Sequence, residues 1–362
     1  MGDIAEIEIQ ELRLPATPDG DDASEFREVC QALDAVVLDT WGNLDRAPTP
    51  RSRLGDWRPT DNSTLSVFVA RDRAGVAGVA FCYAALRDNL DSAWLRVEVP
   101  PQRRRRGIGS ALLARVEECA AGYGRHIFQS STEHPEGFAS SKLLFPVTGA
   151  GGVPESAPGA AFALRHGYRL EQTTRFSVLD LKENQDWSDA EAEAQRIAGS
   201  DYEVLTWTDQ CPAELLDQMA AIMGRMSTDS PAGGLEIEAE RWDAARVREV
   251  EATAREQGQI GLTAVARHRR SGELAAYTTI YVDPEKPWVA DQDDTLVMRR
   301  HRGHRLGMLI KIANLRRLRE RFPAVERVMT FNAEENEHML AINVTLGFRP
   351  AGYDGEWQKR TI

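Results

Sequence analysis

The sequence of 362 residues has few cysteines and no long apolar segment. The four cysteines show no Cys-x-x-Cys or Cys/His spacing, so a zinc site is not indicated and we expect buried, reduced thiols. No stretch reaches the roughly 18 apolar residues of a membrane-spanning helix. The first residues lack the basic and then apolar order of a signal peptide. We therefore expect a cytoplasmic protein without a membrane partner.

Positive charge is also scarce. Lys and Arg total 44 against 56 Asp and Glu, which gives a net charge of −12. Such a balance argues against nucleic acid as the main partner and is compatible with a small cationic substrate. Neither GxxxxGK[ST] nor GxGxxG occurs, so a Walker loop and a Rossmann fingerprint are absent.

The chain has the composition of a soluble globular protein, with 42% hydrophobic and 28% charged residues. Its length favours two domains. Hydrophobic periodicity predicts the same order twice: a strand, helical segments, three strands, a basic glycine loop and a long helix. We expect a first domain over 1–181, a polar linker with little core over 182–201, and a second domain over 202–362. A stretch over 134–158, rich in Gly, Pro, Ser and Ala, reads as an insertion in the first copy.

Each copy has a glycine loop between a strand and a helix. Glycine lets successive amides turn toward one anion, and a helix N-terminus adds unpaired donors. The two loops run through Arg104-x-x-Gly107-Ile108-Gly109 and Arg302-Gly303-His304-Arg305-Leu306-Gly307. A plain turn at a helix start is the alternative to a phosphate site.

These loops belong to longer motifs. The first is Val99-x-Pro101-x-x-Arg104-x-x-Gly107-Ile108-Gly109-x-x-Leu112-Leu113, and the copies close on Gly167-Tyr168 and Gly347-Phe348. The second runs from Val297 to Gly307, with a later segment from Asn332 to Asn343. Together they resemble the GCN5-related N-acetyltransferase (GNAT) family, twice over nearly the whole chain, in an arrangement similar to that of mycothiol synthase. The resemblance implies an α/β fold of two tandem GNAT-like domains, each a mixed, mostly antiparallel sheet flanked by helices.

The resemblance also implies an activity. It implies acetyl-CoA as co-substrate, no metal, and direct attack by a primary amine of a small molecule on the acetyl group. The implied acetyl-CoA contacts are Val99, Arg104, Gly107, Ile108, Gly109 and Ser110 in the first copy, and Val297, Met298, Arg302, Gly303, His304, Arg305, Leu306, Gly307, Asn336 and Asn343 in the second.

Two features depart from the family pattern. Arg305 stands where the first glycine of a pair is usual. The tyrosine four residues before the closing Gly-aromatic pair is replaced by Ala163 in the first copy and by Asn343 in the second. Asn343 retains the capacity to hydrogen-bond CoA, which Ala163 lacks.

Acylation of an amine needs a base, and this family often places it on the strand before the loop. Because strand side chains alternate, residues an even number before the opening valine share its face. Counted from Val297, these include Asp293 and Asp291, our candidate bases, with Asp294 in reserve. A solvated turn over residues 291–294 is the alternative. In the first copy the same positions are apolar, and Glu98 lies on the opposite face.

We therefore expect the second domain to be catalytic and the first to be degenerate or structural. Trp288 is our candidate pocket wall, and Asp229, in the 229–234 loop, our candidate acceptor contact. Two alternatives stay open: a catalytic first domain that uses Glu98, and a non-catalytic acyl-CoA-binding or scaffold protein. We expect a monomer with an internal pseudo-dimer, or a weak homodimer.

Overall fold

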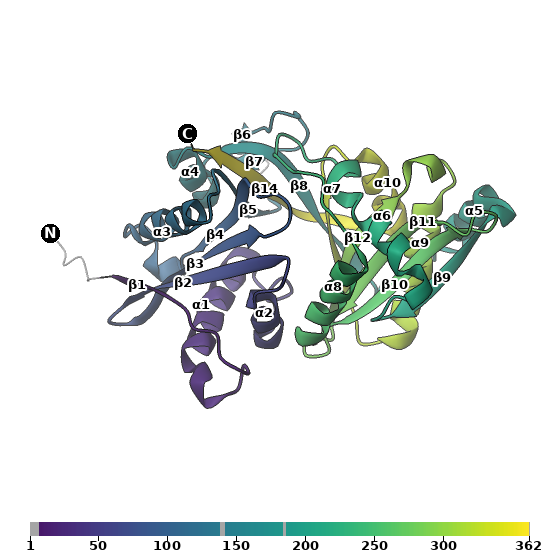
Figure 1. Cartoon of the computed structure of the whole chain (residues 1–362). Coiled ribbons are helices and arrows are strands. Elements are labelled where there is room, and N and C mark those ends of the chain that lie inside the picture. Colours follow the sequence, from purple (N-terminus) through teal and green to yellow (C-terminus); the bar gives the residue numbers. More distant parts are fainter. Residues whose placement is uncertain (1–6, 138–141, 184–185, 362) are drawn as a thin grey trace. The chain divides into compact units, whose positions relative to one another are not determined.

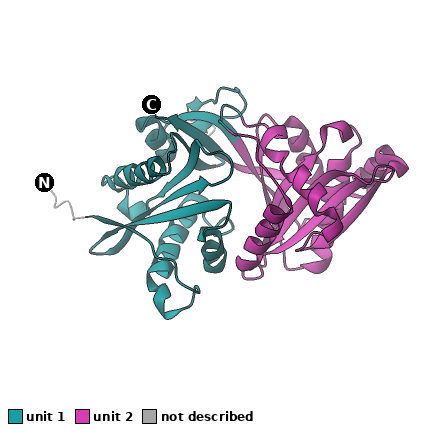
Figure 2. Ribbon diagram, viewed as in Figure 1, with its two compact units in different colours: residues 1–173, 233–236, 354–362 teal, residues 174–232, 237–353 magenta. Residues whose placement is uncertain are grey.

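The computed structural model describes residues 7–137, 142–183 and 186–361. The chain divides into two compact units, coloured separately in Figure 2. Unit 1 comprises Met1–Thr173, Gly233–Glu236 and Asp354–Ile362, and unit 2 comprises Thr174–Ala232 and Ile237–Tyr353. None of the described helices is both long enough and apolar enough to cross a membrane.

Unit 1 is a mixed sheet between two layers of helices (Figure 1). Its strands follow the order β1-β2-β3-β4-β5-β14, in which β4 and β5 are parallel. Helices α1 and α2 pack on one face, and α3 and α4 on the other. The elements are β1 (Glu8–Glu11), α1 (Ser24–Trp41), α2 (Pro50–Trp57), β2 (Ser63–Asp72), β3 (Gly75–Ala85), β4 (Ser92–Glu98), α3 (Ile108–Gly122), β5 (Ile127–Pro135), β6 (Leu143–Leu144), β7 (Val153–Pro154), α4 (Pro158–Arg165) and the end of β14 (Arg349–Arg360).

Unit 2 has the same plan, with strand order β8-β13-β12-β11-β10-β9 and a parallel β12–β13 pair. Helices α6 and α8 cover one face, and α5 and α9 the other. The elements are β8 (Arg169–Asp180), α5 (Ser188–Ala198), β9 (Tyr202–Thr208), α6 (Leu216–Met223), α7 (Met226–Asp229), α8 (Ala244–Glu256), β10 (Ile260–His268), β11 (Leu274–Val282), β12 (Val289–Val297), α9 (Leu306–Arg321), β13 (Arg327–Ala333) and α10 (Glu337–Leu346). The predicted fold class, a repeated α/β domain with a mostly antiparallel sheet, is confirmed.

Two strands cross the boundary between the units along the chain. The Thr174–Asp180 part of β8 pairs with β13 in unit 2, although the sequence placed it in the first domain. The last residues of β14 complete unit 1, although the sequence placed them in the second. Trp357 of this segment is fully buried in the unit 1 core, where its Nε1 donates to Thr132 Oγ1 at 2.8 Å. Each unit is therefore built from segments far apart in sequence.

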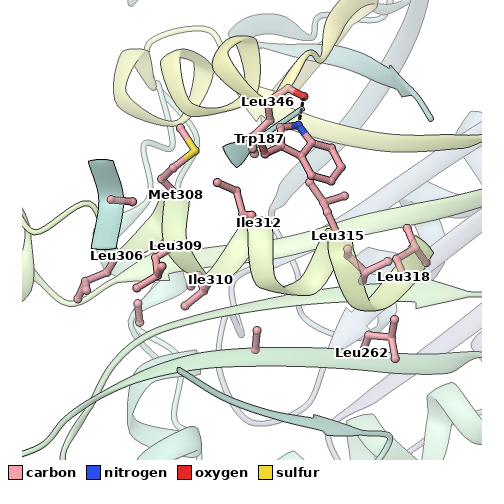
Figure 3. Packing of buried hydrophobic residues seen from close by; sticks show 14 of the residues in the cluster. Trp187, Leu262, Leu306, Met308, Leu309, Ile310, Ile312, Leu315, Leu318 and Leu346 are labelled. Atoms are coloured by element: carbon pink, nitrogen blue, oxygen red, sulfur yellow. Dashed lines mark hydrogen bonds between the residues drawn. The ribbon is translucent and has the colours of Figure 1, made fainter. Parts of the chain in front are cut away.

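The segment over 182–201 is more than a polar linker. Its helix α5 packs on α9, and Trp187 is 4% exposed within the unit 2 core. Figure 3 shows the Trp187 ring beside Leu315, with Nε1 donating to the carbonyl of Leu346 at 2.9 Å. The expectation that this segment contributes little to the core is wrong, because the large side chain of Trp187 is buried there although its neighbours in sequence are polar.

The acidic residues before the second loop lie within a strand. Strand β12 begins at Val289, so residues 291–294 are not the solvated turn that stood as the alternative. The insertion over 134–158 contains the small β6–β7 pair. Its first residue, His134, is buried on β5, and its Nε2 lies 2.8 Å from Thr132 Oγ1.

Candidate functional site

The loop before α9 forms a set of free amide donors in unit 2. Gly303 and Arg305 both adopt left-handed backbone, with φ of 88° and 55°, and Arg305 is the N-cap of α9. Within the described chain no acceptor receives the backbone amides of residues 303–307. Leu306 and Gly307 are buried, while residues 302–305 are exposed. Free amides at a helix N-terminus, with a positive end of the helix dipole, suit a phosphate group.

The loop before α3 in unit 1 repeats this backbone with the glycine moved. Here Arg105 and Gly107 take the left-handed conformation, with φ of 64° and 81°. Arg105 therefore corresponds to Gly303, and Gly107 to Arg305. The departure at Arg305 is a change of residue without a change of conformation, so this position still forms the turn.

Arg302 lies within the loop of unit 2. Its Nε donates to the Val297 carbonyl at 3.3 Å, and its Nη2 donates to Asp229 Oδ2 at 3.3 Å. Arg299 also donates to Asp229 Oδ2, at 3.1 Å. The side chain of Asp229 is only 5% exposed. Its carboxylate is thus engaged by loop arginines rather than open to an acceptor.

A bulge interrupts β12 at the acidic residues. Thr278 pairs with Thr295, but Ile280 pairs with Gln292, so β12 carries one extra residue across this step. A bulge re-aims side chains, and the alternation counted back from Val297 does not hold beyond it. Asp294, the reserve candidate, turns to Tyr277, whose hydroxyl donates to its Oδ2 at 3.0 Å. The corresponding strand pair of unit 1, β3 and β4, has no such shift in register.

The three aspartates have unequal surroundings. Desolvation, then the negative charges of Asp294 and Asp291, raise the pKa of Asp293 to about 7, although its side chain remains accessible to solvent. Burial also raises the pKa of Asp294, against the hydrogen bond from Tyr277, and the Glu240 carboxylate adds to the rise. Asp293 is therefore the accessible carboxylate poised to take up a proton near neutral pH.

Beyond Gln292, β12 and β13 separate. Their parallel pairing covers Val289–Gln292 and stops, although β13 continues to Ala333 along β8. Buried side-chain amides stand on β12 at Gln292 and on α10 at Asn343. Asn343 Nδ2 donates to Asn332 Oδ1 at 2.6 Å, while Asn343 Oδ1 and Gln292 Oε1 have no donor. Buried acceptors without donors are rare, so these two atoms are candidates for contact with a bound N–H group.

Three other predicted residues have local partners. The side chain of Asn336 caps α10 by accepting from Met339 N at 3.3 Å. Trp288 precedes β12, at the opposite end from Val297, and its carbonyl accepts from the amides of Glu326 and Arg327. His304 is exposed beside the Tyr202 ring, with 5.3 Å between ring centroids. Val297 and Met298 flank the loop and pack in the two cores of unit 2.

The corresponding region of unit 1 is occupied by ion pairs. Pairing of β4 with β5 ends at Trp94, as in unit 2, but Arg96 then bridges Glu98 and Glu133. Arg46 joins Glu133 to Asp354. Glu98, the alternative base, is held in this network.

The unit 1 loop also has local contacts. Arg104 donates to the Val99 carbonyl at 2.9 Å. Ser110 Oγ lies 3.0 Å from His166 Nε2. A Cβ on Gly109 would come 3.3 Å from Phe162, which explains a small residue there, and Ile108 is buried as the first residue of α3.

Sequence reasoning missed Tyr277, Gln292 and Asn332. Tyr277 and Gln292 sit in ordinary strand patterns and acquire a role only through the bulge and the strand separation. No group of three or more His, Cys, Asp or Glu side chains able to hold a metal ion occurs among the described residues.

Comparisons with known proteins point to one fold. No family model and no curated protein matches the chain. A tandem GNAT protein from the clavulanic acid biosynthesis pathway, solved without acetyl-CoA, is similar over 98% of both chains, with 25% identity and a TM-score of 0.74. A GCN5-related N-acetyltransferase from Sphaerobacter thermophilus is similar over 98% of this chain and 95% of that one, with 13% identity and a TM-score of 0.60.

A third similar structure is the GCN5-related glucosamine N-acetyltransferase region of a fungal multi-domain β-N-acetylglucosaminidase. It covers 98% of this chain and 38% of that one, with 14% identity and a TM-score of 0.63. The repeated order of strands, the glycine loops and these similarities lead to one conclusion: the chain has the tandem GNAT fold, with two units built on the same plan.

Proposed function

We propose that unit 2 transfers an acetyl group from acetyl-CoA to a primary amine of a small molecule. The observation that carries this proposal is the bulge in β12. It presents Asp293 and Asp294 at the point where β12 leaves β13, on the strand that leads directly into the free amides of the α9 loop. A base and an anion site therefore lie on one continuous segment.

The base would act on the amine. An ordinary alkylammonium, with a pKa near 10.4, loses its proton at pH 7 at a cost of about 4–5 kcal/mol. A carboxylate with a pKa of about 7 is half ionised at that pH and matches the task better than one near 4. Asp293 would accept the proton, directly or through water. The charge of Asp294, which accepts the hydrogen bond from Tyr277, is one of the causes that raise the pKa of Asp293, so Asp294 would support the base.

The chain offers groups that fit acetyl-CoA, which would supply the acetyl group. The amides of residues 303–307 and the Arg302 guanidinium would hold the pyrophosphate. The unpartnered Oδ1 of Asn343 and Oε1 of Gln292 would accept hydrogen bonds from the amide N–H groups of the pantetheine arm. Amide side chains donate hydrogen bonds but no proton, so Asn343 would not act as an acid for the departing thiolate.

The acceptor would be cationic. Asp291, Asp293 and Asp294 share one stretch of β12, and Glu240 is close enough to affect the pKa of Asp294. Such a negative field attracts ammonium groups and disfavours acidic acceptors. Polyamine-like or aminosugar-like compounds are therefore the first acceptors to test.

Unit 1 would have a structural role. It keeps the loop amides, but Glu98 and Glu133 are both paired with Arg96, and its β4 has no bulge. Against its desolvation, the charges of Arg96 and Arg46 lower the pKa of Glu133, which makes this carboxylate a poor base.

The test is acetylation of an amine panel, together with calorimetric titration by acetyl-CoA. Asp293→Asn should reduce kcat by a hundredfold or more, in the range of a lost general base, with acetyl-CoA affinity nearly unchanged. Glu98→Gln in unit 1 is the matched control and should leave kcat unchanged. Equal activity of the double variant D293N/D294N would remove both from the mechanism. Acetyl-CoA binding without turnover of any amine would favour a non-catalytic acyl-CoA-binding protein.

A further inference from the structure

Two tyrosines of β11 stand on the face of unit 2 that carries the acidic residues, and only one of them has a partner. The pairing of β11 with β10 is regular from Ala276 to Val282, so Tyr277 and Tyr281, four residues apart, share one face. Tyr277 packs in the core formed with α6 and α8, and its hydroxyl donates to Asp294 Oδ2 at 3.0 Å. Within the described part of the chain the hydroxyl of the half-buried Tyr281 makes no hydrogen bond.

The ring of Tyr281 is held beside the candidate bases. Tyr281 is directly opposite Asp291 across β11 and β12, so the two side chains are neighbours on one face. Its partner on β10 is Gly261, where a Cβ would come 3.3 Å from Tyr281 Cε1. Glycine at this position therefore makes room for the ring. The ring stands just beyond the bulge that contains Asp293.

The surroundings of Tyr281 keep its hydroxyl protonated. Burial, and then the negative charges of Asp293, Asp294 and Glu251, raise the pKa of Tyr281. The hydroxyl is therefore a permanent hydrogen-bond donor. Such a donor is satisfied by a lone pair on a bound molecule.

The chemistry of the donor narrows the class of acceptor. An ammonium group carries N–H donors and no lone pair, so it suits the carboxylates of β12 and cannot accept from Tyr281. A hydroxyl group next to the amine does offer a lone pair. An acceptor with both groups matches this face better than one with amines alone.

We propose that the acceptor of unit 2 is an amino alcohol, with a hydroxyl close to its primary amine, and that Tyr281 donates a hydrogen bond to the oxygen of this hydroxyl. The inference rests on the proposed function and selects between the two acceptor classes named there. Aminosugar-like compounds satisfy both the carboxylates and Tyr281, whereas an unsubstituted polyamine leaves the Tyr281 hydroxyl unpaired.

The experiment compares two diamines of equal length, 1,3-diaminopropan-2-ol and 1,3-diaminopropane, which differ by one hydroxyl. For the full-length protein, kcat/KM is measured with each as acceptor, and binding of each without acetyl-CoA is measured by ligand-observed NMR. In Tyr281→Phe, kcat/KM for the hydroxylated diamine should fall by about two- to tenfold, the range of one hydrogen bond, with the other diamine unchanged. Because the hydroxyl also alters the basicity of the amines, the deciding quantity is the ratio between the two diamines in wild type against that in the variant.

Two further variants are controls. Tyr277→Phe removes the hydroxyl bound to Asp294, so it should affect both diamines alike and preserve their ratio. Gly261→Ala keeps the phenol but crowds its ring, and should lower the ratio as Tyr281→Phe does.

Each outcome is informative. If both diamines are acetylated and Tyr281→Phe leaves their ratio unchanged, the amino-alcohol proposal is wrong and the proposed acetyl transfer stands. An equal loss with both diamines also overturns it, since the hydroxyl then acts on a group common to both reactions. If neither diamine is acetylated, but the hydroxylated one binds more tightly and only while Tyr281 is present, the acceptor site stands and the acetyl transfer is wrong. Absence of binding and of acetylation with both diamines overturns the proposal.

Discussion

Arg302 donates to the carboxylate of Asp229 at 3.3 Å, and in unit 1 Arg104 donates to Asp39 at 2.8 Å. Both arginines also donate to the carbonyl of the valine that opens their loop. Asp229 is the last residue of α7, and Asp39 lies in the last turn of α1. In both units, therefore, an aspartate and a valine carbonyl hold the arginine of the glycine loop. We infer that Asp229 supports the conformation of this loop.

This support of the loop makes a prediction about Asp229→Ala. Partly exposed ion pairs contribute about 0.2–1 kcal/mol, so acetyl-CoA affinity should fall by up to about fivefold, with the KM for the amine nearly constant. Titration and steady-state kinetics measure both. Asp39→Ala is the counterpart in unit 1 and should not alter turnover. If only the KM for the amine rises strongly, Asp229 contacts the acceptor, as the sequence suggested.

The pKa of Asp293 predicts a pH profile. A base works when ionised, so kcat/KM should rise with pH and level off above about 7. In the Asp293→Asn variant, kcat/KM should not show this rise with pH. Because the folded-state pKa is raised, the carboxyl stabilises the fold at low pH and this contribution disappears as pH rises through 7. The same variant should therefore melt higher than wild type in alkaline buffer and not in acid. An unchanged rise with pH in the variant would assign the base elsewhere.

Arg305→Gly tests the left-handed turn. A non-glycine residue in this conformation costs about 1 kcal/mol, so the substitution should raise the stability of unit 2 by up to that amount. Gly303→Ala, at the other left-handed position, should have the opposite sign. Urea unfolding followed by tryptophan fluorescence gives both values. If Arg305→Gly is destabilising, the Arg305 side chain contributes contacts that outweigh its backbone strain.

Trp187→Ala tests the segment expected to be a linker. Removal of a buried tryptophan typically costs about 3–5 kcal/mol, which is a large part of a domain's stability. A flexible linker would tolerate the change with no shift in the melting temperature. Trp288→Ala, at a side chain that is 37% exposed, is the control and should cost much less.

Much of the fold follows from local sequence patterns. The apolar runs of β2, β3, β10 and β11 predict strands, and the basic glycine loops predict where α3 and α9 begin. The prediction of the linker was wrong because a single residue decides whether that segment belongs to the core. Trp187 is one apolar residue in a polar segment, and no periodicity identifies it as core.

The candidate site was predicted in outline only. Residue type and loop spacing drew attention to Asp291, Asp293 and Asp294. The directions in which these side chains point depend on the bulge in β12. One extra residue in a strand cannot be recognised from the composition of the segment. The strands that pair with β8 and β14 could not be predicted either, because the apolar pattern of a strand does not specify its neighbour in the sheet.

The completion of unit 1 by residues 354–361 bears on how the chain is made. Trp357 fills the unit 1 core, yet it is translated after all of unit 2. While the ribosome synthesises unit 2, the nascent first unit has an uncovered strand edge and a missing tryptophan. Such an edge is a site for wrong pairing. Folding of this protein therefore cannot proceed strictly from the amino to the carboxyl end, and the first unit to emerge is the last to close.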